Sequence, residues 1–240
     1  MSNKSDTRMC QEIASGVYCM EVGKNISQSN DYFIQSGTSR VLIDATSSNR
    51  SKLIKKIVES LFGANTKPIS ILLMHDHPDY AGSALELAHM WDCPVYVDPD
   101  ELPYAAIEDP STVEKYANPQ DQCIILPLLR LIPRQPVELM LSMASIKDVV
   151  QGFAPDATVP DLPEWQCVPR LGHTPGYVAF FRTSDRVLIT GDAIVTANLN
   201  SLWGFFMGFT AKQAEGLQSA VVLNMELAGS KRVRCYSCRA

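Results

Sequence analysis

A short apolar run followed by a cluster of polar side chains constrains the fold most. Residues 69–74 follow Pro68, and their length and branching predict a buried β-strand. The next six residues carry two histidines, two aspartates and a tyrosine, in the order His-Asp-His-Pro-Asp-Tyr from 75 to 80. A helix is predicted over 83–91, because Ser83 and Glu86 have the spacing of a capping box, and 94–98 is typical of a further strand. This order indicates an α/β fold in which polar side chains collect at strand ends.

The flanking sequence predicts the elements that complete one compact domain of 240 residues. Strands are expected at 16–22, 31–35, 40–44, 177–182 and 186–190. Gly37 and Thr38 have the character of a hairpin turn. A helix is predicted over 51–62, where apolar residues recur with helical period, and Gly63 is its natural end. A last helix is predicted over 210–227, with Thr210 and Gln213 at capping-box spacing.

Two segments lack this regular pattern. Eleven of the 15 prolines lie between 99 and 169, which favours irregular loops with short helical pieces. We interpret residues 99–170 as an irregular cover over the site, and expect substrate identity to be decided there. Residues 229–240 are short, basic and contain Cys235 and Cys238, and are interpreted as a divergent tail.

Only four histidines are present, and three of them lie in turn-like segments beside Gly, Pro, Asp or Thr. His75 and His77 are two residues apart after a strand, so in extended backbone both side chains point the same way and can reach one ion. Neutral imidazoles bind zinc at about 2.0 to 2.1 Å, and catalytic zinc uses three protein ligands with one open position. His173 in Gly-His-Thr-Pro-Gly and Asp192 in Gly-Asp-Ala are the candidates for further ligands. The fourth histidine, His89, lies in the predicted helix over 83–91 and is not expected to be a ligand.

The order of these motifs resembles the metallo-β-lactamase fold superfamily. The resemblance rests on residues 12–17, 41–44, 75–82, 173–176 and 191–192. It implies an α/β fold, a four-layer αβ/βα sandwich with the metal site at one edge between two sheets. It also implies that His75, His77 and His173 form a first metal site, that Asp79 belongs to a second, and that Asp192 bridges both.

The sequence departs from the family pattern at two points. Tyr80 stands where the family has a histidine of the second site, and no histidine follows His173. The second site would keep only Asp79, Asp192 and the Tyr80 phenol, which is a poor donor set for zinc. We therefore expect one ion. Asp79, freed from ligation, is expected to orient a water or relay its proton; Tyr80 either donates to a developing oxyanion or packs.

Three functions are open on these observations. The leading one is hydrolysis of an ester, thioester, lactone or amide by metal-bound hydroxide, with zinc as the ion. The second uses His75, His173 and Asp192 as a two-histidine, one-carboxylate iron site and resembles the persulfide dioxygenase branch of the superfamily. The third is a catalytically silent member that acts as a binding protein. Asp44, after the strand at 40–44, is a candidate to orient a ligand histidine.

Composition excludes several partners. The net charge is −5, with no basic stripe that could neutralise phosphates, so nucleic acid is not expected. No run approaches the roughly 18 apolar residues of a membrane span, and the polar start lacks the features of a signal peptide. We expect a cytoplasmic protein with a small-molecule substrate and reduced thiols at its seven cysteines. The sequence carries no signal for oligomeric state.

Overall fold

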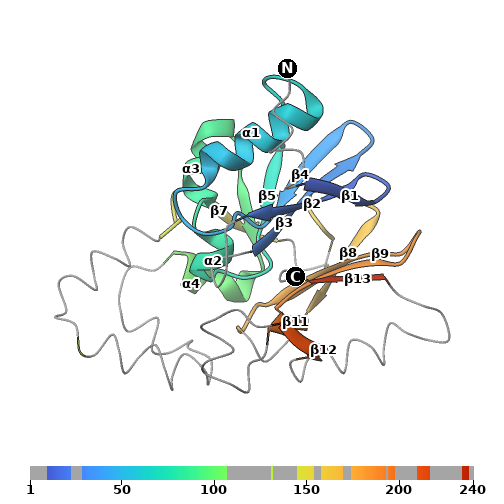
Figure 1. The fold of residues 1–240 in the computed structure, drawn as a ribbon. Coiled ribbons are helices and arrows are strands. Elements are labelled where there is room, and N and C mark those ends of the chain that lie inside the picture. The colour runs from blue at the N-terminus through green and yellow to red at the C-terminus, as the bar shows by residue number, and fades with distance from the viewer. Residues whose placement is uncertain are drawn as a thin grey trace.

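The computed structural model describes residues 10–22, 29–106, 131, 145–153, 158–169, 174–192, 194–197, 210–216 and 234–237. Within these residues the chain forms two main sheets with helices against the larger one (Figure 1). The larger sheet has the order β1-β2-β3-β4-β5-β6-β7. Its strands are β1 (Cys10–Ala14), β2 (Val17–Val22), β3 (Ser29–Ser36), β4 (Ser39–Ile43), β5 (Ser70–Leu72), β6 (Val95–Val97) and β7 (Val150–Gly152).

The larger sheet changes character halfway across. Strands β1 to β4 form antiparallel pairs, whereas β4, β5, β6 and β7 pair in parallel. Parallel neighbours need crossover connections, and helical elements lie in all three of them here. The helical elements are α1 (Ser51–Phe62), α2 (Pro78–Ala81), α3 (Ala84–Trp91), the 3-10 helix η3 (Pro99–Glu101) and α4 (Leu102–Ala105).

The second sheet has four strands in the order β13-β10-β9-β8. They are β8 (Trp165–Pro169), β9 (Val178–Arg182), β10 (Val187–Gly191) and β13 (Arg234–Ser237). Strands β8, β9 and β10 are antiparallel neighbours, and β13 runs parallel to β10. A separate pair joins β11 (Ile194–Ala197) and β12 (Thr210–Gly216).

Alternation along the strands builds two apolar layers. On β3, Tyr32 and Ile34 belong to the cluster that also contains Val178 and Phe180 of β9, so this layer lies between the two sheets. Phe33, between them in sequence, faces the other way and packs in the cluster that holds Ile54 of α1. Helices α1 and α3 cover that outer face, and β8, β9 and β13 lie on the opposite side (Figure 1). The α/β sandwich predicted from the sequence is confirmed, with three of its four expected layers among the described residues.

Most predicted elements have the expected bounds. Helix α1 covers Ser51–Phe62 as predicted and ends at Gly63, and β3 and β4 join through the two-residue turn Gly37–Thr38. Strands β2, β5, β6, β9 and β10 lie within one or two residues of the predicted ranges. The four cysteines whose side chains are described, Cys10, Cys19, Cys93 and Cys167, are free thiols.

The predicted helix over 210–227 is wrong in its first part. Residues Thr210–Gly216 form β12, antiparallel to β11, and 217–227 lie outside the described residues. The pairing with β11 supplies backbone partners that a weak helical signal, already interrupted by Gly216, does not outweigh.

The predicted capping box is also wrong. The Ser83 hydroxyl makes no cap hydrogen bond; it donates to the Ser47 carbonyl at 2.7 Å and accepts from the Arg50 amide at 3.1 Å. Ser83 therefore ties the start of α3 to the loop before α1, which is a tertiary contact that sequence spacing does not reveal.

The described part of the segment over 99–170 combines short helical pieces, as predicted, with two strands that were not predicted. It contains η3, α4 and two strands, β7 and β8, each at the edge of a sheet. Pro169 is tolerated because it ends the edge strand β8, where an amide hydrogen is not required by an outer neighbour. Residues 107–130, 132–144, 154–157 and 170 lie outside the described structure. Among the described helices none is long and apolar enough to cross a membrane.

Asp31 on β3 carries a carboxyl group that is fully buried. One oxygen accepts the Thr46 amide at 3.1 Å, and burial raises the pKa of Asp31 well above its usual value. The folded state therefore keeps this proton at pH values where the unfolded chain has lost it. The contribution of Asp31 to the free energy of unfolding falls as pH rises above about 4.

We expect Asp31→Asn, which cannot ionise, to gain stability relative to the wild type between pH 5 and pH 8. The gain is at most about 1.4 kcal/mol per pH unit while the folded carboxyl stays protonated. Urea unfolding at both pH values measures it, with the exposed Asp148→Asn as the matched control. A stability difference that stays constant with pH would contradict the assignment.

Candidate metal centre

The parallel strands β4, β5 and β6 end at the same edge of the larger sheet. Ile43, the last residue of β4, pairs with Leu72, the last residue of β5, and Leu72 pairs with Tyr96 of β6. The residues that follow these three strands therefore come together: Asp44 after β4, the histidine loop after β5 and η3 after β6. Such an edge is the usual site for chemistry in α/β folds.

Met74, the residue before the first histidine, is fixed from both sheets. Its amide donates to Asp44 Oδ1 at 3.0 Å, and its carbonyl accepts the amide of Val178, the first residue of β9, at 3.0 Å. The Asp44 carboxyl group thereby holds the backbone ahead of His75, so in the described residues its support of a ligand histidine runs through the main chain. The reason is positional, because Asp44 follows the strand adjacent to β5.

Helix α2 begins directly after the second histidine. Pro78 occupies its first position, where no amide hydrogen is needed. The His77 carbonyl accepts the amides of Tyr80 at 2.9 Å and Ala81 at 2.8 Å. This single turn places the Tyr80 side chain back toward His75, with ring centroids 4.2 Å apart.

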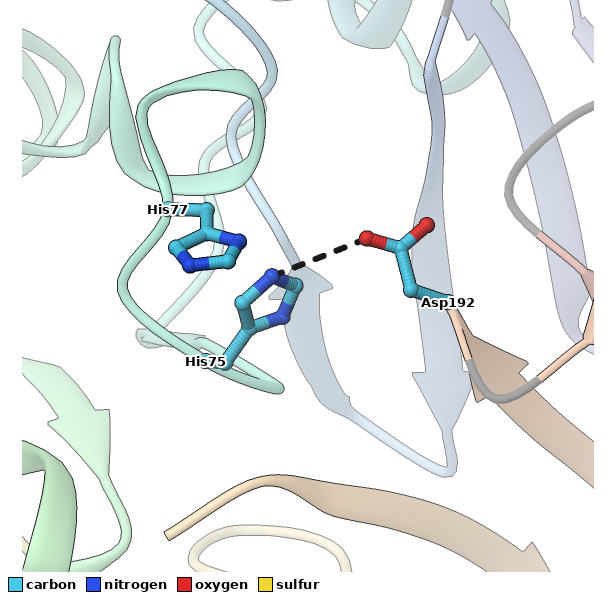
Figure 2. A group of neighbouring side chains, drawn as sticks. All are labelled: His75, His77 and Asp192. Carbon is cyan, nitrogen blue, oxygen red and sulfur yellow. Dashed lines mark ion pairs between the residues drawn. The ribbon is translucent and has the colours of Figure 1, made fainter. Parts of the chain in front are cut away.

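Three potential ligands converge between the two sheets. His75 and His77 come from the loop after β5, and Asp192 comes from the end of β10 (Figure 2). One ligand atom from each lies within 4.8 Å of the other two, and His75 Nε2 is 3.8 Å from Asp192 Oδ2. His75 is fully buried and Asp192 nearly so, whereas His77 is half-buried. The centre is thus open to solvent on the His77 side.

Aromatic rings surround His75. Besides Tyr80, the His77 ring lies 4.5 Å away and the Tyr177 ring 5.1 Å away, both edge-on. The Tyr177 hydroxyl donates to the Thr190 carbonyl, which ties the start of β9 to the end of β10. Packing on three sides restricts the His75 ring to a narrow range of orientations.

The Tyr80 phenol binds the candidate carboxylate ligand directly. Its hydroxyl donates to Asp192 Oδ1 at 2.7 Å, and the side chain is 1% exposed. Asp192 therefore uses one oxygen for Tyr80 and turns the other, Oδ2, toward His75. A phenol-to-carboxylate hydrogen bond of this length is charge-assisted when the carboxylate is ionised.

Gly191 is required for Asp192 to reach this position. Its φ angle is +51°, and a Cβ atom would lie 2.5 Å from the Tyr177 hydroxyl and 3.0 Å from Met74 Sδ. The lack of a side chain at Gly191 thus lets the backbone beside Asp192 pack closely against Tyr177 and Met74.

The remaining predicted residues are not all brought together. His173 lies outside the described residues. Asp79 is half-buried at the second position of α2, and is not among the three residues whose ligand atoms converge in the described structure. Sequence reasoning missed Tyr177 and Glu101. Neither had a local signal, because Tyr177 was counted only as the start of a strand and Glu101 lies in the segment predicted to be irregular.

The profile of the Metallo-beta-lactamase superfamily matches residues 25–221. The chain belongs to this superfamily. The probable metallo-hydrolase YflN of Bacillus subtilis (strain 168) is 34% identical over 191 residues, which are 77% of this chain and 66% of the relative. The match therefore spans just under two thirds of that relative's length.

Solved structures of the metallo-β-lactamase fold superpose on most of the chain. A metallo-beta-lactamase family protein of Thermus thermophilus has a TM-score of 0.65 at 17% identity, covering 95% of this chain and 74% of its own. A protein solved in a di-iron-bound form has a TM-score of 0.55 at 21% identity, covering 92% and 91%. At these identities the likeness establishes the fold.

The donor set of this superfamily member suits a transition metal ion. In a tetrahedral site with bonds of about 2.1 Å, ligand atoms lie about 3.4 Å apart. The 3.8 Å between His75 Nε2 and Asp192 Oδ2 is within a few tenths of an ångström of that value. Two imidazoles and one carboxylate are donors that zinc and iron both accept.

We expect Asp44→Ala to weaken zinc binding about 10- to 100-fold, because it leaves the buried Met74 amide without its acceptor and frees the backbone beside His75. Asp44→Asn is the matched control. Burial raises the pKa of Asp44 well above its usual value, so the neutral amide resembles the favoured form and keeps an oxygen for Met74. Chelator competition measures both affinities; equal weakening in the two variants would contradict a role through the Met74 amide.

Proposed function

We propose that this chain is a metal-dependent hydrolase with a single zinc ion, held by His75, His77 and Asp192 together with His173. The observation that carries the proposal is the convergence of two imidazoles and one carboxylate between the sheets of a metallo-β-lactamase fold. His173 directly precedes the described Thr174, in the segment that leads into β9. The substrate class is a carboxylic ester, thioester, lactone or amide.

Zinc in such a site lowers the pKa of a bound water to about 7 and polarises a carbonyl oxygen. The protein's own side chains would position the metal ligands and accept the proton that the water releases. Asp79 is the proposed proton acceptor: it is half-buried in the first turn of α2, two residues after His77. A carboxylate there can accept a hydrogen bond from water near the ligands and orient it.

The proposed single occupancy depends on Tyr80. A second ion of the family type would use both oxygens of Asp192 as a bridge, together with an imidazole at position 80. Here a phenol occupies that position and its hydroxyl donates to Asp192 Oδ1. A second ion would have to displace this hydrogen bond and accept only carboxylate ligands, which favours one ion. Tyr80 then acts by orienting Asp192, and we assign it that role ahead of oxyanion donation.

An iron enzyme is the second candidate. The converging set of two imidazoles and one carboxylate is also the donor set of mononuclear iron oxygenases. A structural neighbour was solved with two iron ions. Metal identity separates the two candidates. Cytoplasmic location and the absence of nucleic-acid and membrane partners stay predictions from the sequence.

Purified protein is expected to contain about one zinc ion per chain and to hydrolyse at least one of four probes: p-nitrophenyl acetate, an acyl thioester, an acyl-homoserine lactone and an acyl p-nitroanilide. His75→Ala should lose the metal, with kcat/KM lowered more than about 100-fold, because the ion supplies several kcal/mol of transition-state stabilisation. His89→Ala, an exposed histidine on α3, is the matched control and should match the wild type.

Elemental analysis and rate measurements decide between the candidates. One iron ion per chain with no hydrolysis would contradict the hydrolase and support the iron oxygenase. A folded protein with no metal and no activity would indicate the silent binding protein.

Replacing Tyr80 tests the reason for single occupancy. Tyr80→His supplies the missing imidazole and removes the hydrogen bond to Asp192, so we expect up to two zinc ions per chain at saturating zinc. Tyr80→Phe removes only the hydroxyl and should keep one ion, bound several-fold more weakly because Asp192 loses its partner. Titration followed by elemental analysis measures both. Two ions in the wild type would refute the argument.

A further inference from the structure

Glu101 has a carboxylate that is buried without a cationic partner in any recorded contact of the described structure. Its residue exposure is 0%, and it ends the 3-10 helix η3, directly after β6. Removing a carboxylate from water is costly unless hydrogen bonds replace the lost hydration. Burial of the Glu101 carboxyl group therefore costs free energy of folding, and its hydrogen bonds offset that cost.

Each Glu101 oxygen accepts one backbone amide from a different loop. Oε2 accepts from Asp76 at 3.0 Å, and Oε1 accepts from Gly176 at 2.9 Å. Asp76 lies between His75 and His77, and Gly176 lies in the segment that leads into β9. These segments belong to the two sides of the sandwich and are 100 residues apart in the sequence. One side chain thus connects the histidine loop to the start of the second sheet.

The local structure is fitted to this connection. A Cβ atom on Gly176 would lie 2.7 Å from the Glu101 nitrogen and 2.9 Å from Glu101 Cγ, so only glycine permits the approach. Asp98 caps η3 by accepting the Asp100 amide at 2.9 Å, and the Asp98 carbonyl accepts the Glu101 amide at 2.9 Å. The turn that carries Glu101 is therefore itself held in place.

We propose that Glu101 is a positioning residue for the metal centre, which fixes the His75–His77 loop relative to residues 174–176 through the amides of Asp76 and Gly176. Among the described residues its carboxyl group bonds to backbone amides and to no ligand side chain in any recorded hydrogen bond, so it acts on the position of the backbone that carries the ligands. This inference rests on the proposed function in that it assumes a metal ion at His75, His77 and Asp192. Both oxygens of the Glu101 carboxyl group act as hydrogen-bond acceptors, so the role requires two accepting oxygens at this position.

Glu101→Gln tests the proposal with little change in volume. The glutamine amide has one accepting oxygen and one donating nitrogen. The variant therefore loses one of the two hydrogen bonds and places the glutamine NH2 group opposite a backbone N–H group. We expect zinc affinity, measured by chelator competition, to fall about tenfold or more. We also expect the visible spectrum of the cobalt-substituted protein, which reports ligand geometry, to change. Glu164→Gln, at an exposed position, is the matched control and should change neither.

The outcomes separate this inference from the proposed function. If the wild type binds neither zinc nor cobalt, the metal centre itself is refuted. If the wild type binds both ions and Glu101→Gln has the same affinity and the same cobalt spectrum, only the role of Glu101 is overturned, even if its melting temperature is lower. Should Glu101→Gln not fold, Gly176→Ala replaces it, since its Cβ would force residues 174–176 away from the turn that carries Glu101. Unchanged metal binding in that variant overturns the proposal equally.

Discussion

The proposed metal centre depends on hydrogen bonds from backbone amides of the histidine loop to buried carboxyl groups. Asp44 accepts the Met74 amide and Glu101 accepts the Asp76 amide, so the amides on either side of His75 are both held. The Met74 carbonyl accepts from Val178 and links the loop to the second sheet. A loop without regular secondary structure is thereby given the rigidity of the two sheets around it, which is what metal ligation at fixed distances requires.

The proposal of a single ion rests on one departure from the family pattern, the tyrosine at position 80. The Tyr80 hydroxyl donates a hydrogen bond to Asp192, whereas an imidazole at this position would supply a ligand atom for a second metal ion. This hydrogen bond orients the Asp192 carboxylate so that Oδ2 points toward His75 and is available to one metal ion. Burial, and to a smaller extent the nearby Asp192 carboxylate, raise the pKa of the Asp44 carboxyl group.

Local signals in the sequence predicted the scaffold well and the supporting contacts poorly. The period of α1, the apolar run at β5 and the Gly37–Thr38 turn each determine structure within a few residues, and the structure agrees. The sequence predicts that His75, His77 and Asp192 lie close together, because residue types that bind metals stand beside strand ends, and the structure brings these three together. Glu101 and Tyr177 act through contacts with residues far along the chain, so no local pattern marked them. Strands β8 and β12 each pair with the neighbouring strand in chain order, but the prolines before β8 and the capping-box spacing at Thr210 pointed to other structures.

Anomalous scattering from crystals of the zinc-loaded protein, recorded at the zinc absorption edge, tests the account most directly. It predicts one strong peak, about 2.0 to 2.2 Å from an imidazole nitrogen of His75, one of His77 and Oδ2 of Asp192, with the Tyr80 hydroxyl still bonded to Oδ1. Two peaks about 3.5 to 4 Å apart would contradict the single-ion centre, and a peak elsewhere or none would contradict the centre itself.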